Sequence, residues 1–224
     1  MEANFWLPYL DLDDDGQSLG YFHDTWSIRD VSTKSAFEIL RTEIGLARLV
    51  DEAARDQREF EILAEAVESP SVENADRVEF GHVSSELMDE ICSDVPPGLE
   101  SLELGVAGLV HALATYGCLP AASCRGHIYD PPRRPWSEAP VVYFAVDKER
   151  AHRLVPLVRA SGCGFNFDPE RPNLILIEAP SIIETMLLAE NILLSFPSGL
   201  SVEHRAMLSE CRNGPDNPDQ ATLW

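Results

Sequence analysis

The chain has 224 residues, and its 38 acidic residues outnumber its 17 lysines and arginines, which gives a formal net charge of −21. Such a charge repels phosphate backbones and anionic membranes, so it excludes non-specific binding to nucleic acid or to membrane surfaces. No apolar run reaches the ~18 residues of a membrane span. A hydrophobic content of 45% is enough for a globular core, and the five irregularly spaced cysteines indicate reduced thiols in a cytoplasmic protein.

The sequence predicts an acidic, mainly helical N-terminal part over residues 1–98. Within it, residues 11–16 (Asp-Leu-Asp-Asp-Asp-Gly) match the first half of a calcium-binding loop. The twelfth position of such a loop needs a bidentate acid, and here it is Phe22. An acidic turn is therefore the favoured interpretation.

The segment 33–68 shows the apolar periodicity of helices, and the polar stretch 55–59 is the natural point to divide it into two helices. A capping box formed by Ser35 and Glu38 is expected at its start. We interpret these helices as elements that pack against the core of the protein. Their acidic side chains are expected to form a face exposed to solvent.

The second part, residues 99–212, follows a Pro-Pro-Gly break and is predicted to be an α/β unit. Its apolar helix at 100–116 contains His111, which we expect to be a core histidine with one satisfied nitrogen. The further elements are expected in the order strand 121–125, strand 141–146, helix 148–161, strand 163–168, strand 173–178 and helix 181–195. This order predicts an α+β fold with a small mixed or antiparallel sheet of about four strands flanked by helices. Residues 213–224 are expected to form a disordered tail.

One stretch, Ser123-Cys124-Arg125-Gly126-His127, brings a thiol, a guanidinium and an imidazole together where a strand is expected to enter a loop. Gly126 can adopt a positive φ or let a ligand approach the backbone. Arg125 and His127 can contact an anionic group, with Ser123 and nearby N–H groups as further donors. The neighbouring cations can also activate Cys124 as a nucleophile, with His127 as its catalytic partner.

Four interpretations of this stretch stay open. It can be a strand end whose small residues pack under the preceding helix, a loop that binds an anionic ligand, or a catalytic site built on Cys124 and His127. The fourth is a zinc site in which Cys118, Cys124 and His127 are joined by His111 or Cys163. The spacing of these residues matches no standard structural zinc site, so zinc is the weaker alternative.

The charge of the segment 120–172 also points to this stretch. Its net charge is +2, although the chain as a whole is strongly acidic. A local cationic patch could receive a phosphate or carboxylate without attracting bulk nucleic acid. Arg133, Arg134, Asp168 and Glu178 are the expected neighbours of the site.

Residues 122–126 read Ala-Ser-Cys-Arg-Gly and are followed by His127, residues 165–169 read Phe-Asn-Phe-Asp-Pro, and a helix with paired leucines is expected at 186–193. In these motifs and in the order in which they occur, residues 116–195 resemble a set of prokaryotic proteins with a Ser-Cys-x-Gly-His run. More distantly, they resemble the tRNA wybutosine-synthesising methyltransferase family, which has Arg in place of the histidine. The resemblance implies a pocket for S-adenosylmethionine or a nucleotide near the first two runs. It does not imply tRNA methylation, because the acidic chain disfavours a tRNA substrate.

We therefore expect a cytoplasmic protein that binds a small molecule or nucleotide, or transfers a group, at the Ser123–His127 loop. Arg125 and His127 would hold an anionic group of the ligand, and Cys124 would be either a packed or a reactive thiol. The rival hypothesis is a non-catalytic regulatory protein, similar to an antitoxin or an inhibitor. It would use the acidic face of residues 34–68 to bind a partner with a basic face.

Overall fold

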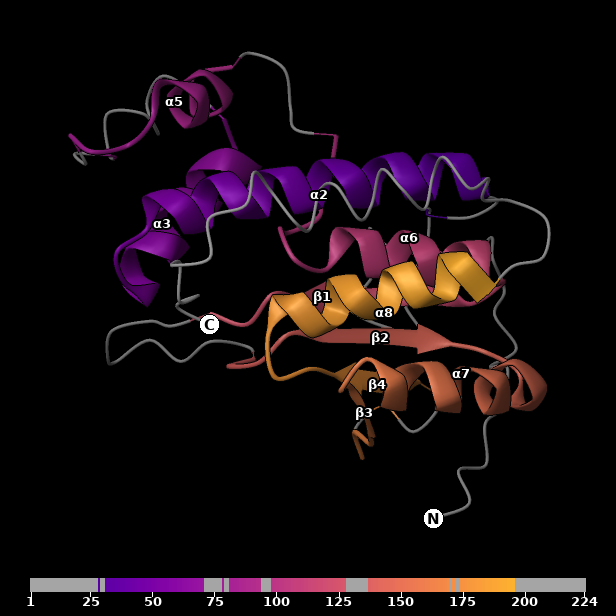
Figure 1. Cartoon of the computed structure of the whole chain (residues 1–224). Coiled ribbons are helices and arrows are strands. Elements are labelled where there is room, and N and C mark those ends of the chain that lie inside the picture. The colour runs from indigo at the N-terminus through magenta and orange to yellow at the C-terminus, as the bar shows by residue number, and fades with distance from the viewer. Residues whose placement is uncertain are drawn as a thin grey trace.

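The structure is a computed structural model that describes residues 28, 31–70, 78, 81–93, 98–127, 137–169, 171 and 174–195. The described residues form six helices and one four-stranded sheet, namely α2 (Thr33–Ala53), α3 (Gln57–Glu68), α5 (Ser85–Ile91), α6 (Ala107–Thr115), β1 (Leu119–Cys124), β2 (Val141–Ala145), α7 (Lys148–Ala160), β3 (Gly164–Asn166), β4 (Ile175–Glu178) and α8 (Ile182–Ser195). This confirms the predicted α+β fold and, from α6 onward, the predicted order of elements (Figure 1). None of the helices in the described part of the chain has the length and apolarity that crossing a bilayer requires. The features expected at 11–16, Arg133, Arg134 and 213–224 lie outside the described residues.

The sheet has the strand order β1-β2-β4-β3, and each neighbouring pair is antiparallel, so the described sheet is antiparallel rather than mixed. Cys124 pairs with Val141, Val141 with Glu178, and Glu178 with Gly164. These four residues therefore mark one end of the sheet. The run that follows Cys124 leaves the sheet at this end, from the edge strand β1.

One face of the sheet carries the main core. Val142 and Phe144 of β2, together with Ile175 and Ile177 of β4, are almost fully buried on this face under α6, α7 and α8. Helix α2 packs across α6 and α8, so its Leu40 joins the same core (Figure 1). The helical N-terminal part therefore shares a core with the α/β unit.

The predicted polar stretch separates α2 from α3. The N-cap of α2 is Ser32, whose Oγ accepts a hydrogen bond from the backbone N–H of Ser35 at 3.0 Å. The expected capping box of Ser35 and Glu38 is therefore wrong by one turn. Asp56 caps α3 in the same way, by accepting from the N–H of Glu59 at 2.9 Å.

The apolar helix is shorter than expected, because α6 begins only at Ala107. Residues 100–101 have φ of 54° and 64°, Gly105 has φ of 94°, and a left-handed backbone cannot continue a right-handed helix. A Cβ on Gly105 would lie 2.3 Å from Cγ2 of Ile182, so α8 packs directly on this turn. The turn brings Glu103 to the end of β1.

A buried glutamate of α2 caps the start of α6. The carboxylate oxygens of Glu43 accept hydrogen bonds from the backbone N–H groups of Gly105 and Gly108, both at 2.9 Å. These N–H groups have no partner within the helix, so the contact stabilises its first turn. Burial nevertheless raises the pKa of Glu43 to about 7. Gly108 permits the close approach, because a Cβ there would lie 2.5 Å from the Glu43 carboxylate.

Candidate functional site

The Ser123–His127 run lies against two segments of the chain that precede it, helix α3 and the turn before α6. Gly126 within the run has φ of 84°. A Cβ on it would lie 2.8 Å from the backbone carbonyl carbon of Ala139 and 2.9 Å from the carbonyl oxygen of Glu138. Only glycine fits this approach, so the shape of the run depends on it.

Arg125 is the buried centre of this contact, with only 3% of its surface exposed. Its Nη1 donates to Glu68, and its Nη2 donates to Glu61 at 3.1 Å. Its backbone N–H donates to Oε2 of Glu103 at 2.6 Å. Among the described residues, its Nε has no acceptor. Arg125 therefore joins β1 to α3 and to the turn before α6.

His127 lies between two of the same glutamates. Its Nδ1 bonds to Glu61, and its Nε2 lies 3.1 Å from Oε1 of Glu103. The hydrogen bond with the Cys124 thiol, followed by those with Glu103 and Glu61, raises the pKa of His127 to about 12. The ring is therefore an imidazolium at neutral pH and donates from both nitrogens.

Three carboxylates thus surround two cations. Burial raises the pKa of Glu68 to about 7 although Arg125 favours its charged form. Burial acts in the same direction on Glu61 and Glu103, but their hydrogen bonds with His127 and the charge of Arg125 outweigh it, so the pKa of each lies below its usual range. The charges of Arg125 and His127 are therefore matched within the protein.

The interpretation of the acids of 33–68 as a solvated face is wrong for the glutamates in these contacts. Glu43 is fully buried, and the side chains of Glu61 and Glu68 are 13% and 12% exposed. They face inward because they pair with cations or accept from backbone N–H groups. Sequence reasoning missed them and Glu103, although the seven-residue spacing of Glu61 and Glu68 places both on one face of α3.

Asp168 and Glu178, the expected neighbours of the site, are engaged elsewhere on the sheet. Asp168 accepts hydrogen bonds from the Tyr143 hydroxyl at 3.2 Å and from Arg171 at 2.6 Å. Glu178 accepts from the side chain of Asn166 at 2.9 Å. Neither carboxylate contacts Arg125 or His127 among the hydrogen bonds of the described residues.

Four of the arginines that the structure describes in the segment 120–172 are each paired with an acid: Arg125 with Glu61 and Glu68, Arg150 with Asp147, Arg153 with Glu149, and Arg171 with Asp168. At the buried Arg125, an anionic ligand would have to compete with two glutamates for the same donors. Arg133 and Arg134 lie outside the described residues, so the cationic patch stays a prediction.

Distance rules out the zinc set that includes Cys118. Cys118 lies in the main core just before β1, and Cys124 is the last residue of the strand. A strand rises about 3.3 Å per residue, so roughly 20 Å separates the two cysteines. Burial raises the pKa of Cys118 far above its usual range and that of Cys163 to about 12. The expectation of one satisfied nitrogen on His111 is also wrong, because neither ring nitrogen of this buried residue has a hydrogen-bond partner in the described structure.

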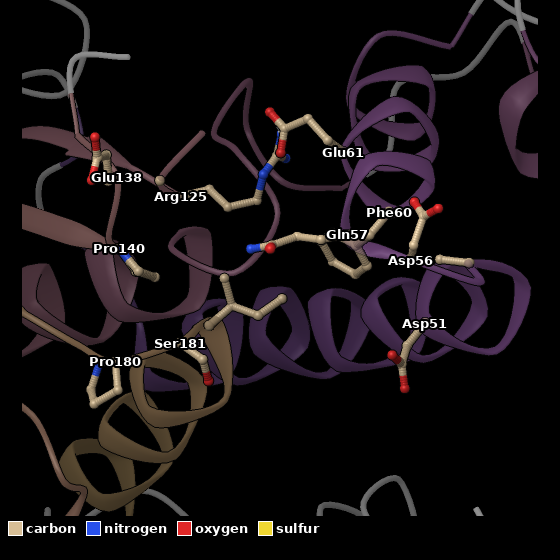
Figure 2. Close-up of a pocket in the computed structure, with 13 residues that line it drawn as sticks. Asp51, Asp56, Gln57, Phe60, Glu61, Arg125, Glu138, Pro140, Pro180 and Ser181 are labelled. Carbon is tan, nitrogen blue, oxygen red and sulfur yellow. Dashed lines mark hydrogen bonds and ion pairs between the residues drawn. The ribbon is translucent and has the colours of Figure 1, made fainter. Parts of the chain in front are cut away.

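A cavity of about 250 Å³ opens beside the cluster (Figure 2). Its walls come from the α2–α3 turn, from α3, from the end of β1, from residues 138–140 and from the start of α8. Its polar lining residues are Asp51, Asp56, Gln57, Glu61, Arg125, Glu138 and Ser181. Figure 2 shows Gln57 reaching from α3 into the space between these walls. Cys124 and His127, the predicted catalytic pair, do not line the cavity.

Comparisons of the chain with protein-family models, with curated proteins and with solved structures found no match. The resemblance of residues 116–195 to the methyltransferase family therefore stays a prediction, as does the pocket for S-adenosylmethionine that it implies. The features of the chain that bear on function are therefore the cluster around Arg125 and the cavity beside it.

Proposed function

We propose that the chain binds a small molecule in the cavity beside the end of β1, and that the ligand presents a cationic group to it. The observation that supports this proposal is the charge of the lining. The lining carries the carboxylates of Asp51, Asp56 and Glu138 in addition to Glu61, whose charge is paired with Arg125, the one lysine or arginine among the lining residues. A pocket with this excess attracts a positive group and repels a carboxylate or a phosphate.

Arg125 does not reverse this balance, because its charge is already matched. Its guanidinium contacts Glu61 and Glu68, and its side chain is only 2% exposed. A ligand carboxylate would have to compete with two protein carboxylates for the same donors. In this proposal, Arg125 positions the cavity wall and does not hold the anionic group that the sequence suggests.

The lining suits an organic cation better than a bare ion. Phe60, Pro140 and Ile182 add apolar surface, while Gln57 and Ser181 add neutral hydrogen-bonding groups. Pockets for small molecules combine apolar walls with a few polar groups in this way. S-adenosylmethionine, which the family resemblance implies, is itself a sulfonium cation and belongs to this class of ligand.

The test is thermal denaturation of the purified full-length chain with primary alkylamines, with carboxylates of equal chain length, and with S-adenosylmethionine and S-adenosylhomocysteine. The last compound lacks the sulfonium charge, so the pair isolates the effect of that charge. A ligand that binds only the native state raises the unfolding midpoint. We expect the cations to raise it and the anions to leave it unchanged. A rise with carboxylates or phosphate, and not with the cations, would overturn the proposal.

Glu138→Gln is the most informative variant, because Glu138 lines the cavity from an exposed position. We expect about tenfold weaker binding of the cationic ligand, equivalent to about 1.4 kcal/mol. Glu149→Gln is the matched control, since it removes the same charge from an exposed position on α7, outside the cavity. Arg125→Ala is unsuitable, because removing a buried ion-paired side chain disturbs the fold and the cavity together.

The rival function, an acidic docking face on residues 34–68, makes a different prediction. On α2, Glu38 and Glu52 are already paired with Lys34 and Arg48, so the exposed face carries both signs of charge. Changing Glu38 and Glu52 to lysine would release a basic partner under the rival hypothesis. Under our proposal, the same changes leave the binding of the cationic ligand unaltered.

A further inference from the structure

We propose that Glu103, Cys124 and His127 bind a zinc ion at the end of β1, a property that does not depend on a ligand in the cavity. Each residue offers one ligand atom, and the three atoms lie within 4.8 Å of one another. The ligands of a tetrahedral zinc ion lie about 3.5 Å apart. Small rotations of the three side chains would therefore bring all three atoms onto a common ion.

The orientation of His127 is that of a metal ligand. Its Nε2 lies 3.1 Å from Oε1 of Glu103, while its Nδ1 is engaged by Glu61. Histidines that bind metals almost always donate their other N–H to a carboxylate or a carbonyl, which fixes the tautomer and the angle of the ring. Glu61 occupies that position, so Nε2 is the nitrogen that faces the ion.

The other two ligands are held by the backbone of the same turn. Sγ of Cys124 accepts the N–H of Gly126 at 3.4 Å, and Oε2 of Glu103 accepts the N–H of Arg125 at 2.6 Å. Oε1 of Glu103 is thereby turned toward His127. The positive φ that only glycine tolerates at position 126 fixes the N–H that supports the sulfur. Each of the three ligands therefore has a partner that orients it.

The charges around the three ligand atoms suit a cation. Besides the proposed ligand Glu103, the carboxylate of Glu61 contacts His127, and that of Glu68 pairs with the neighbouring Arg125. Carboxylates held this close attract a positive ion.

The ligand types favour zinc over calcium and magnesium. Calcium and magnesium take oxygen ligands, whereas a thiolate, an imidazole and a carboxylate together suit zinc. Three protein ligands are the pattern of zinc sites that keep a fourth position for water or another exchangeable ligand. The side chain of Glu103 is 34% exposed, so solvent can reach the ion from this side.

The test uses the untagged full-length chain, stripped with a chelator and titrated with zinc chloride and, separately, with cobalt chloride. Elemental analysis after gel filtration counts the zinc, and a thiolate-to-cobalt charge-transfer band reports a bound cysteine. We expect about one zinc per chain and a clear thiolate band. A zinc content below about one-tenth per chain, or a cobalt spectrum without the thiolate band, would overturn the proposal.

Variants assign the ligands. Cys124→Ser should remove the thiolate band, and Cys163→Ser, which removes a buried thiol outside the site, should retain it. Glu61→Gln should keep the band but weaken zinc binding about 10–100-fold, because Glu61 positions His127 and is not itself a ligand. Circular dichroism checks folding, and the partly exposed Glu103→Gln, which should weaken binding further, serves if Cys124→Ser does not fold. Retention of the band in folded Cys124→Ser, or unchanged zinc affinity in Glu103→Gln, would contradict the assignment.

The zinc site and the cavity ligand can fail separately. Glu138→Gln should leave the zinc content unchanged, because the carboxylate of Glu138 does not belong to the group of potential metal ligands. Cys124→Ser should leave the binding of the alkylamines unchanged, because Cys124 does not line the cavity. If the chain binds the amines but no zinc, the proposed metal site is wrong and the cavity proposal stands. If the chain binds zinc but none of the amines, the cavity proposal is wrong and the metal site stands.

Discussion

Arg125 is a buried cation, and it forms ion pairs with carboxylates that lie far from it in the sequence. Its partners Glu68 and Glu61 lie 57 and 64 residues before it in the sequence. Removing one partner of a buried ion pair leaves the others without compensation, at a cost of about 3–5 kcal/mol. An exposed ion pair contributes far less, because water screens both charges. The two kinds of arginine in this protein should therefore differ sharply on substitution.

Arg125→Ala should lower the free energy of unfolding by about 3 kcal/mol, because it leaves Glu68 without its cation and removes one of the two cations that pair with Glu61. Arg153→Ala is the control, since Arg153 pairs with Glu149 on the surface, and it should cost less than about 0.5 kcal/mol. Urea denaturation at neutral pH measures both. If the two substitutions lowered the free energy of unfolding equally, the buried ion pairs of Arg125 would contribute no more to stability than an exposed pair does.

At the scale of elements, the contact of α2 with α6 positions the turn that carries Glu103. Two glycines on these helices look alike in sequence but differ in surroundings. A Cβ on Gly108 of α6 would lie 2.5 Å from the Glu43 carboxylate and 2.7 Å from Cδ1 of Leu40, whereas a Cβ on Gly45 of α2 would meet nothing within 4 Å. Helix propensity alone favours alanine at both positions by about 1 kcal/mol.

Gly108→Ala should therefore destabilise the protein by about 1–3 kcal/mol, because the added methyl group forces α2 and α6 apart. Gly45→Ala should stabilise it by about 0.5–1 kcal/mol through helix propensity. Thermal and urea unfolding of the two variants give the comparison. Stabilisation by Gly108→Ala would mean that the helices do not approach each other as closely as the structure shows.

The elements themselves could largely be predicted, because hydrophobic periodicity and turn residues are local signals. The seven elements from α6 to α8 follow the expected order. The start of α6 could not be predicted from the sequence. Leu102 and Leu104 continue the apolar pattern of a helix, but the positive φ of Gly105 interrupts the helical backbone before Ala107. Packing against Ile182, 77 positions further on, decides that boundary.

The candidate site was predicted only in part for the same reason. Arg125, Gly126 and His127 stand together in the sequence, so their importance is a local signal. Their partners Glu61, Glu68 and Glu103 come from elements that only the fold brings together, and the acids of a helix are most often solvated. The motif predicts the candidate site from a local signal, but the charged partners of Arg125 and His127 lie 22 to 66 positions away in the sequence.

At the scale of the whole molecule, three groups with raised pKa values make stability fall as the pH rises through the neutral range. Burial raises the pKa of Glu43 and of Glu68 from 4.5 to about 7, so the native state holds their protons more tightly than the unfolded chain does. Their contribution to stability is full below the unfolded value of 4.5 and is lost as the pH rises toward 7. His127, with its pKa raised from 6.5 to about 12, adds a loss that begins above 6.5.

We therefore expect the free energy of unfolding of the metal-free protein to fall between about pH 5 and about pH 8. Each of the two glutamates contributes at most about 1.4 kcal/mol per pH unit. Glu43→Gln should reduce the slope, because an amide does not titrate, and Glu149→Gln, which changes the net charge equally, should not. Urea denaturation across this range is the measurement, and stability that rises with pH there would contradict the raised pKa of Glu43 and Glu68.

In our proposal, the end of β1, where α3 meets Arg125 and His127, is a binding site. Native mass spectrometry of the full-length chain tests it most directly, because it reports a bound metal and a retained small molecule on the folded protein together. With added zinc, we predict one dominant species whose mass exceeds that of the chain by one zinc ion less two protons, and its absence in Cys124→Ser. A folded chain that stays bare, or that takes up zinc as an unselective ladder shared by Cys124→Ser, would contradict the account.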